Sequence, residues 1–463
     1  MPVPLIISVS GLRGEIGVTL TPEVAARYAA AFSATLSDSR PFVITRDGRA
    51  GSELLADAVS AALCSVGRSV VDAGIAATPT TGVLIRQLGA AGGIQISASH
   101  NPRQFNGLKL FNAAGRVIPK AEGEAVLPLY DSFKTGRLPW ADVDHLGKRT
   151  LRNEVTQTTR AHLDAVLATV DVDAIRGKRF RVLLDSNHGA GSLLGRRLLE
   201  ALGCQIVGVG QTPDGAFEHT PEPTAENLAP ILRVVRQAGS EAKIDAAFCQ
   251  DPDADRLAII DENARYIGEE YTLAICVKNR LAKKAGPVVI NSATSRMTID
   301  IAESFGQECF RAPVGEANVV DCMIARGAVF GGEGNGGPID PRVGYVRDSF
   351  VAMAMTLETM ALTGEPLSRL ADALPSYAII KRKVTLPADR IAAVLDGLAK
   401  KYAGEKVDRS DGVRVDFSRS WALVRASNTE PIARIIVEAP EQAAAEALCD
   451  RFRRDTEALL DDK

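Results

Sequence analysis

Residues 42–72 read FVITRDGRAGSELLADAVSAALCSVGRSVVD, and this stretch decides the fold class. The β-branched and aromatic residues of Phe42–Thr45 predict a buried strand, and Ser69–Asp72 predicts another. Between them, Ser52–Ser65 has the apolar spacing of an amphipathic helix. A strand, a helix and a second strand in this order predict a crossover unit, in which the two strands lie parallel in one sheet.

The same alternation recurs along most of the chain. Further strands are expected at 93–96, 179–185, 205–209, 246–249 and 288–291, near 309 and at 328–331. Further helices are expected at 21–36, 80–88, from 192, and at 226–237, 268–280, 297–305 and 316–324. The last part differs, with strands at 377–386, 413–417, 421–425 and 434–438 between helices at 388–401 and 441–460. The pattern predicts three similar α/β blocks followed by an α+β domain.

The composition excludes several classes of partner. The 463 residues include 54 Lys and Arg against 57 Asp and Glu, whereas a dedicated nucleic-acid binder carries a basic surplus. No stretch approaches the roughly 18 apolar residues that cross a bilayer, and the start of the chain lacks the basic segment of a signal peptide. We therefore expect a cytoplasmic protein that binds neither nucleic acid nor membrane. The expected oligomeric state is either a monomer or a homodimer.

The seven cysteines are scattered along the chain and form no C-x-x-C pair. This spacing fits neither a disulfide framework nor a zinc site. We expect reduced thiols, as in a cytoplasmic protein.

Three carboxylates alternate in Asp251-Pro252-Asp253-Ala254-Asp255-Arg256. In an extended loop, alternate side chains point the same way, so these anions repel one another unless a cation lies between them. Hard oxygen ligands suit Mg²⁺, and three of them leave room for a phosphate or water ligand. One alternative is a solvated acidic loop. The other is an EF-hand, but Arg256 stands where that turn needs glycine, and both flanks are expected to be strands.

A second candidate loop, Ser97-Ala98-Ser99-His100-Asn101-Pro102, directly follows the expected strand at 93–96. Open α/β sheets place their sites at such strand ends, so Ser99 could be a nucleophile with His100 and Asn101 as polar support. An ordinary turn serine is the alternative. Ten residues further on, Lys109 lies between apolar residues, and partial desolvation would lower its pKa toward the range of a general base.

Two later loops could bind a ligand. Residues 331–337 read GGEGNGG, in which five glycines allow close backbone approach and Glu333 and Asn335 suit two neighbouring hydroxyls. This is neither a dinucleotide fingerprint nor a P-loop, and a flexible surface loop is the alternative. Residues 425–431 read RASNTEP, with Arg434 just after, which favours a phosphate cradle over a plain turn. Early loops containing Arg13 and residues 46–49 add guanidiniums, which more often form surface salt bridges.

These four motifs occur together and in this order, one in each block. In this respect the chain resembles the α-D-phosphohexomutase superfamily over essentially its whole length. The family pattern combines a serine loop ending in S-H-N-P, a D-x-D-x-D-R metal loop, a G-E-x-x-G sugar loop and an R-x-S-x-T-E-P phosphate loop. The N-terminal loop departs from the common F-G-T-x-G-x-R-G, but Arg13 and Gly14 match it. The sugar loop, with Asn335 and Gly337, resembles the phosphoglucosamine mutase-related branch.

The resemblance implies three similar α/β domains with mixed sheets and a C-terminal α+β domain, forming a heart-shaped molecule around a central cleft. Turn and polar residues at the expected boundaries then divide the chain into residues 1–153, 154–262, 263–371 and 372–463. In that order, the domains would carry the phosphoserine, metal-binding, sugar-binding and phosphate-binding loops.

The resemblance also implies a Mg²⁺-dependent enzyme that interconverts hexose 1- and 6-phosphates through a phosphoserine and a hexose 1,6-bisphosphate. Glucosamine phosphate is the first choice of substrate, and glucose or mannose phosphate the alternative. The implied catalytic residues are Ser99, His100, Lys109 and Arg13. The implied metal ligands are Ser99, Asp251, Asp253 and Asp255. The implied substrate-binding residues are Arg256, Gly315, Glu333, Asn335, Arg425, Ser427, Asn428, Thr429 and Arg434.

Two rival classes remain at this stage. A nucleotide-dependent kinase or dehydrogenase would explain the α/β blocks and the glycines, but the chain lacks the corresponding phosphate-binding fingerprints. A non-catalytic sugar-phosphate binding protein could keep the same loops. The presence of both Ser99 and Lys109 favours an enzyme.

Overall fold

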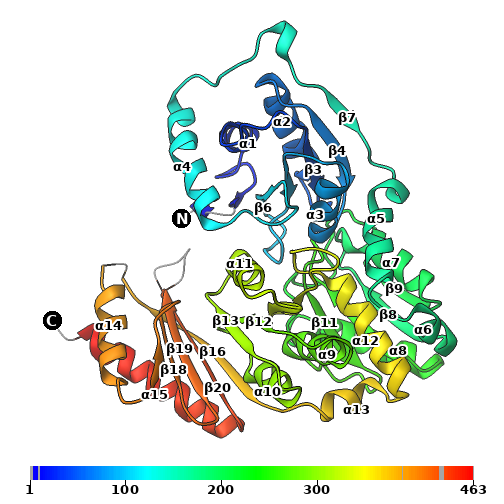
Figure 1. Ribbon diagram of the computed structural model, residues 1–463, viewed down its shortest axis with the longest axis vertical. Coiled ribbons are helices and arrows are strands. Elements are labelled where there is room, and N and C mark those ends of the chain that lie inside the picture. Colours follow the sequence, from blue (N-terminus) through cyan, green and yellow to red (C-terminus); the bar gives the residue numbers. More distant parts are fainter. Residues whose placement is uncertain (1–3, 9–10, 388, 427–431, 462–463) are drawn as a thin grey trace.

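The computed structural model describes residues 4–8, 11–387, 389–426 and 432–461, which form four separate sheets in chain order (Figure 1). The first sheet belongs to the blue and cyan part of the chain. The second and third, in green and yellow, lie beside each other below it, and the orange and red part forms the fourth.

The first sheet contains the crossover unit that residues 42–72 predict. Its strands run in the order β1-β2-β6-β5-β3-β4-β7, and β3 pairs in parallel with both β4 and β5, whereas β6 is antiparallel to β5. The unit consists of β3 (Phe42–Arg46), α2 (Ser52–Ser65), β4 (Val70–Ile75), α3 (Thr78–Gln87), β5 (Gly92–Ile96) and β6 (Phe105–Asn112). The sheet is therefore mixed, because the chain turns back after β5.

The second and third sheets repeat this unit. Their orders, β11-β10-β8-β9 and β15-β14-β12-β13, match β6-β5-β3-β4 strand for strand. The second unit consists of β8 (Arg181–Asp185), α7 (Gly191–Ala201), β9 (Gln205–Val209), α8 (Ala229–Glu241), β10 (Ala246–Gln250) and β11 (Leu257–Asp261). The third consists of β12 (Val288–Asn291), α10 (Arg296–Ser304), β13 (Cys309–Ala312), α11 (Glu316–Arg326), β14 (Phe330–Glu333) and β15 (Gly337–Ile339). The expected three similar α/β domains are confirmed.

Further elements extend the first sheet and lead to the second. They are β1 (Ile6–Ser8), β2 (Gly11–Glu15), α1 (Pro22–Ala34), α4 (Lys120–Thr135), a 3₁₀ turn (Val143–His145), β7 (Arg149–Leu151), α5 (Val155–Leu167) and α6 (Val172–Lys178). Strand β2 is antiparallel to β6, with Gly11 opposite Lys109. Arg13 and Lys109 therefore lie on the same face of the sheet.

Helices α9 (Glu269–Lys283), α12 (Ser349–Thr363) and α13 (Leu367–Asp372) complete the middle of the molecule. The sequence analysis missed α12, because nearly all of its residues are buried and it lacks a polar face. One hydrophobic cluster includes Leu184 of β8, Phe330 of β14 and Phe350 of α12. The second and third domains therefore share a core.

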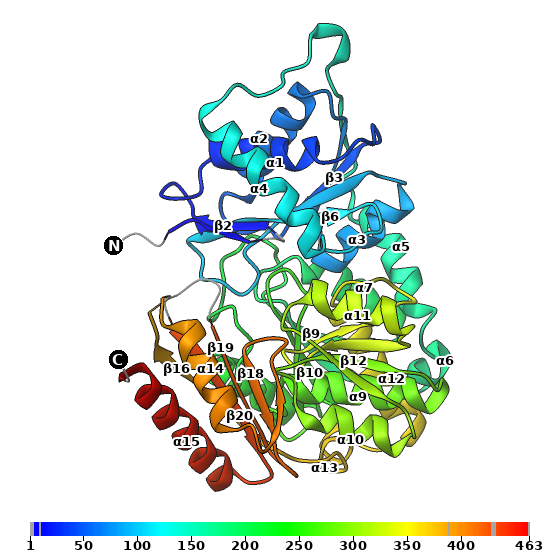
Figure 2. The same cartoon turned by 60° about the vertical axis from the view of Figure 1, so that its left-hand side comes forward.

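The fourth sheet is wholly antiparallel, in the order β16-β20-β19-β18-β17, which confirms the α+β domain. Its elements are β16 (Ala378–Thr385), α14 (Ile391–Lys401), β17 (Lys406–Asp408), β18 (Val413–Asp416), β19 (Trp421–Ala426), β20 (Ile432–Ala439) and α15 (Gln442–Asp461). Helices α14 and α15 cover one face (Figure 2). On the other face, Trp421, Leu423 and Ile436 pack against Ala293 of the third domain.

All seven cysteines are free thiols, as their spacing predicts. Within the described ranges, no helix has the length and apolar character that a membrane crossing requires.

Candidate active site

Three of the loops singled out in the sequence occupy equivalent places in the first three domains. The serine loop (residues 97–104) follows β5, the metal loop (residues 251–256) follows β10, and the sugar loop (residues 334–336) follows β14. Each connects a parallel strand to the antiparallel strand beside it. Open α/β sheets place ligands at the carboxyl ends of their parallel strands, so the repeated topology brings one loop of each domain to such an end. Glu333 ends β14 and does not lie in the loop, because that strand runs two residues further than expected.

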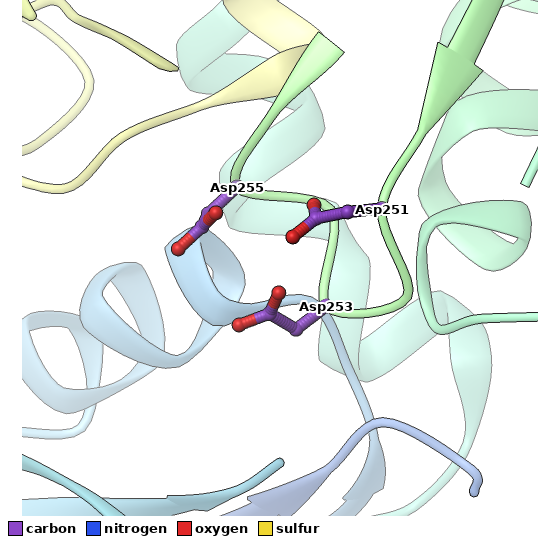
Figure 3. A group of neighbouring side chains, drawn as sticks. All are labelled: Asp251, Asp253 and Asp255. Carbon is purple, nitrogen blue, oxygen red and sulfur yellow. The ribbon is translucent and has the colours of Figure 1, made fainter. Parts of the chain in front are cut away.

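The metal loop directs three buried carboxylates into one space (Figure 3). One oxygen from each of Asp251, Asp253 and Asp255 lies within 4.8 Å of the others. Asp253 Oδ1 and Asp255 Oδ1 are buried without a hydrogen-bond partner. Burial and repulsion from the other two carboxylates raise the pKa of Asp251 well above its usual range. Orphaned carboxylate oxygens and mutual repulsion are what a bound cation would relieve, so these residues fit a hard divalent metal ion.

Lys109 holds the other oxygens of the same carboxylates. Its Nζ donates to Asp253 Oδ2 at 3.0 Å and to Asp255 Oδ2 at 2.9 Å. Burial acts to lower the pKa of Lys109, but Asp253, Asp255 and Glu316 outweigh it and raise that pKa above its ordinary value. The direction is opposite to the one expected from the apolar neighbours in the sequence. Sequence neighbours could not reveal carboxylates that arrive from another domain.

The hydroxyl of Ser99 lies at the metal loop. Its Oγ donates to Asp251 Oδ2 at 2.8 Å and lies 3.3 Å from His100 Nδ1. The residue is buried, with a left-handed φ of 48°, and its backbone N–H donates to Ser97 Oγ at 2.8 Å. Strained backbone of this kind is held in place by its surroundings and is concentrated at functional sites.

Arg49 holds the serine loop through hydrogen bonds to its backbone, a role that the sequence analysis did not foresee. Its guanidinium is fully buried, donates to Asp47 Oδ2 at 2.8 Å and donates to the carbonyl oxygens of Ser99, Asn101 and Phe105. Asp47 also accepts the hydroxyl of Ser97 at 2.6 Å. Residues 46–49 were expected to form surface salt bridges. Arg49 and Asp47 instead hold the serine loop in place through buried hydrogen bonds.

Positive charge surrounds the serine and metal loops. Arg13 Nη1 donates to Asn101 Oδ1 at 3.1 Å, and Arg256 Nε lies 3.8 Å from Asp255 Oδ1. The nearby Arg256 charge, together with burial and Arg13, holds the pKa of His100 well below its usual value. His100 is therefore a neutral imidazole at neutral pH.

Glu333, at the end of β14 beside the sugar loop, lies in a dense polar network. Its Oε1 accepts from Asn291 Nδ2 at 2.7 Å and from the Gly315 N–H at 3.0 Å. Asn335 lies two residues on, and its Oδ1 is buried without a partner. The carboxylate of Glu270, at the start of α9, lies against Gly334, where a Cβ would be only 2.2 Å from both of its oxygens. Burial raises the pKa of Glu270 to about 8.

Arg347, which the sequence analysis also missed, contacts both Glu333 and Asp255. No pattern around it in the sequence distinguishes it from an ordinary surface arginine. Only the packing of the third domain against the second reveals these contacts.

The fourth domain presents a row of basic residues. Arg434 lies opposite Arg425 on β19 and opposite Lys383 on β16. Like charges directly opposite one another in a sheet are unfavourable, and an anion over them would relieve the repulsion. Arg425 is held by Asp411, which also accepts the Val314 N–H at 2.9 Å. Three other predicted residues of this loop, Ser427, Asn428 and Thr429, lie outside the described residues.

Comparisons with known proteins match the whole architecture. Models of the phosphoglucomutase/phosphomannomutase α/β/α domains I, II and III match residues 5–135, 160–266 and 269–377, and the model of the C-terminal domain matches residues 379–455. A phosphoglucomutase/phosphomannomutase of Thermococcus kodakarensis is 37% identical over 94% of both chains. A probable phosphoglucosamine mutase of Methanopyrus kandleri is 32% identical over 96% of both. A phosphoglucomutase/phosphomannomutase family protein of Burkholderia thailandensis has the same fold, with a TM-score of 0.84, 24% identity and 99% coverage of each chain.

These matches, with the four-domain architecture, define an isomerase-type phosphotransferase. The chain belongs to the phosphoglucomutase/phosphomannomutase family, within the α-D-phosphohexomutase superfamily.

Proposed function

We propose that this phosphohexomutase interconverts hexose 1-phosphate and hexose 6-phosphate through a phosphoserine at Ser99 and a hexose 1,6-bisphosphate intermediate. The observation that carries the proposal is the position of Ser99 Oγ, 2.8 Å from Asp251 Oδ2 and beside two orphaned carboxylate oxygens. A serine in that position is suited to carry a phosphoryl group next to a bound cation.

Each half-reaction would exchange one bond for another. The bond from Ser99 Oγ to phosphorus breaks as a substrate hydroxyl forms a new oxygen–phosphorus bond, and the hydroxyl proton must leave. Lys109, which contacts the carboxylates of the metal loop, is the proposed acceptor of that proton. With the carboxylate charge shared with a cation, burial would prevail and lower its pKa. Phosphoryl transfer depends mainly on positioning and charge neutralisation. Arg13 and Arg256 would supply positive charge, and the neutral imidazole of His100 would supply a hydrogen bond.

Asp251, Asp253, Asp255 and the phosphoserine would hold one Mg²⁺. When bound, it would neutralise charge on the transferring phosphoryl group. Water would otherwise hydrolyse the phosphoserine, so closure of the fourth domain over the site should protect it.

One phosphate grip would serve both substrates. The row of Arg425 and Arg434, with Ser427, Asn428 and Thr429, would hold the phosphate that is not reacting. Glu333, Asn335 and the Gly315 backbone would hold the sugar hydroxyls. Because only one end of the sugar can lie at Ser99 at a time, the 1,6-bisphosphate must turn over between the two transfers.

Glucosamine phosphate is the proposed substrate, and glucose or mannose phosphate the alternative. Glu270 lies against Gly334 of the sugar loop, and an ammonium group on the sugar would favour the ionised form of its buried carboxyl. Several relatives are named as probable phosphoglucosamine mutases, whereas the one at 37% identity is named phosphoglucomutase/phosphomannomutase. The ratio of kcat/KM for the three 1-phosphates discriminates between the proposed substrate and its alternatives.

Phosphopeptide mass spectrometry tests the phosphoserine directly. After incubation with glucose 1,6-bisphosphate, we expect one phosphate at Ser99, and we expect Ser99→Ala to lose both the phosphate and turnover. Ser60→Ala is the matched control, because Ser60 is also buried but lies in α2 and makes no hydrogen bond through its hydroxyl. An unphosphorylated Ser99 or a fully active Ser99→Ala would refute the mechanism.

A further inference from the structure

Arg347 lies two residues before α12 and joins the metal loop of the second domain to Glu333 of the third. Its Nη2 donates to Asp255 Oδ2 of the metal loop at 2.6 Å, and its Nη1 donates to Glu333 Oε2 beside the sugar loop at 2.8 Å. Its Nε lies 3.3 Å from Glu316 Oε2, and the side chain is only 9% exposed. One buried guanidinium therefore holds three carboxylates.

The backbone around Arg347 is anchored on both sides. Its own N–H donates to Glu316 Oε1 at 3.1 Å, and the next N–H, of Asp348, donates to the Pro338 carbonyl at 2.8 Å. Asp348 Oδ1 then accepts the N–H of Phe350 at the start of α12. With the backbone held in this way, the side chain approaches the site from one direction.

Gly337 makes room for this approach. A Cβ at Gly337 would lie 2.4 Å from Arg347 Cδ, closer than real atoms come. The glycine that begins β15 thus has a packing reason. It allows the aliphatic part of Arg347 to cross the β14–β15 turn.

Arg347 orients two carboxylates that have different proposed roles, Asp255 as a metal ligand and Glu333 as a sugar ligand. Arg347 and Lys109 both hold Asp255 Oδ2, which leaves Oδ1 as the buried oxygen without a partner. At Glu333, Arg347 takes one oxygen, and Asn291 and Gly315 take the other. Groups that orient metal-binding carboxylates commonly change metal affinity when they are mutated.

We infer that Arg347 is a positioning residue that links the metal loop to the sugar loop, so that one side chain sets both metal affinity and sugar binding. The inference rests on the proposed function, because it takes Asp255 as a metal ligand and Glu333 as a sugar ligand.

Arg347→Lys tests this link. Lysine keeps the charge, but a single ammonium lacks the planar fork that reaches two carboxylates through separate nitrogens. We expect Mn²⁺ affinity, measured by electron paramagnetic resonance without substrate, to fall about 10- to 100-fold. We also expect KM for glucosamine 1-phosphate to rise about tenfold. Excess Mg²⁺ should restore kcat and leave KM raised, a separation that general destabilisation would not produce.

Arg116→Lys is the matched control. Arg116 is also buried and forms an interdomain ion pair with Asp321 at 2.6 Å, but it contacts neither loop. It should leave Mn²⁺ affinity and KM within about twofold of the wild type, within the spread expected away from a site. If Arg347→Lys fails to fold, Gly337→Ala displaces the same side chain and should give the same two effects.

The outcomes separate this inference from the proposed function. Wild-type Mn²⁺ binding that Arg347→Lys leaves unchanged, or a change in only one of the two affinities, would overturn the link alone. A wild-type protein that binds no Mn²⁺ would overturn the proposed metal site, and the link with it.

Discussion

The position of Ser99 depends on a single buried arginine. A left-handed backbone at a non-glycine residue costs on the order of 1 kcal/mol, so the loop needs contacts that favour it over relaxed alternatives. Arg49 supplies them by donating to several carbonyl oxygens of the serine loop, and Asp47 fixes the guanidinium. The Ser99 carbonyl among them is buried, so it needs a donor from within the protein.

We predict that Arg49→Lys lowers kcat about 100-fold while the protein stays folded. A lysine cannot span the same carbonyls, and a displacement of about 1 Å at a reacting group commonly costs that factor. Steady-state kinetics and the rate of Ser99 phosphorylation measure the effect. Arg46→Lys is the control, because Arg46 pairs with Glu53 and Asp72 at longer distances and does not contact the loop. Equal losses in both variants would contradict the prediction.

At the scale of elements, loops that follow parallel strands support one another across domains. The loop after β3 packs against the second domain, where a Cβ on Gly48 would lie 2.3 Å from the Pro213 carbonyl oxygen.

In the second domain, His219 Nε2 lies 2.8 Å from Asp185 Oδ2 at the end of β8, and Nδ1 lies 2.8 Å from the Thr220 carbonyl. Both partners are acceptors, which favours the doubly protonated ring.

This contact predicts a pH dependence of stability. Burial acts to lower the pKa of His219, but Asp185 and the Thr220 carbonyl raise it above its ordinary value. A raised folded-state pKa means that the stabilisation is complete below the unfolded value and is lost as pH rises through the folded one. We therefore expect the contribution of His219 to the unfolding free energy to be about 1 kcal/mol smaller at high pH than at low pH.

Urea unfolding of wild type and His219→Gln, from about pH 6 to pH 9, measures this dependence. The difference in unfolding free energy between the two proteins should shrink as pH rises. His145→Gln is the control, because His145 is exposed and its partner, Asp142, is exposed too. A constant difference between wild type and His219→Gln across the range would contradict the prediction.

Across the whole molecule, a run of polar contacts connects the fourth domain to the first. It passes through the loop before α11 and through the guanidinium between the sugar and metal loops. Each hydrogen bond in the run is about 3 Å long or shorter, and Val314 and Gly315 are neighbours in the chain. The run consists of Arg425, Asp411, Val314, Gly315, Glu333, Arg347, Asp255 and Lys109.

A second junction joins the first three domains at Asp348, the residue after Arg347 in the chain. His162 of α5 is fully buried, with Nδ1 2.9 Å from Thr80 Oγ1 of α3 and Nε2 2.8 Å from Asp348 Oδ2.

We predict that Thr80→Val lowers the unfolding free energy by about 1–3 kcal/mol, because it leaves a buried imidazole nitrogen unpaired. Calorimetry should show the loss, with KM unchanged. Thr156→Val, on an exposed position of α5, is the control, and a Thr80→Val protein as stable as this control would contradict the prediction.

The parallel strands and their helices were predictable because they carry strong local patterns. The bounds of α2, β9 and β12 match the expected ones. Helix α8 begins at Ala229, three residues later than expected, with Pro230 in its first turn. Strands β6 and β15 were not predicted as strands. Strand β15 has only three residues, and β6 carries no strict alternation of buried and exposed positions.

The sequence by itself determined the class of protein, the order of the four loops and the residue types that each presents, because these are properties of local pattern and spacing. Tertiary structure alone decided the charge state of Lys109 and the roles of Arg49 and Arg347. These depend on burial and on partners that lie in other elements of the fold, such as Asp253, which is 144 positions from Lys109 in the chain. A pKa or an ion pair is set by the groups that folding brings together, and local sequence does not encode that distance.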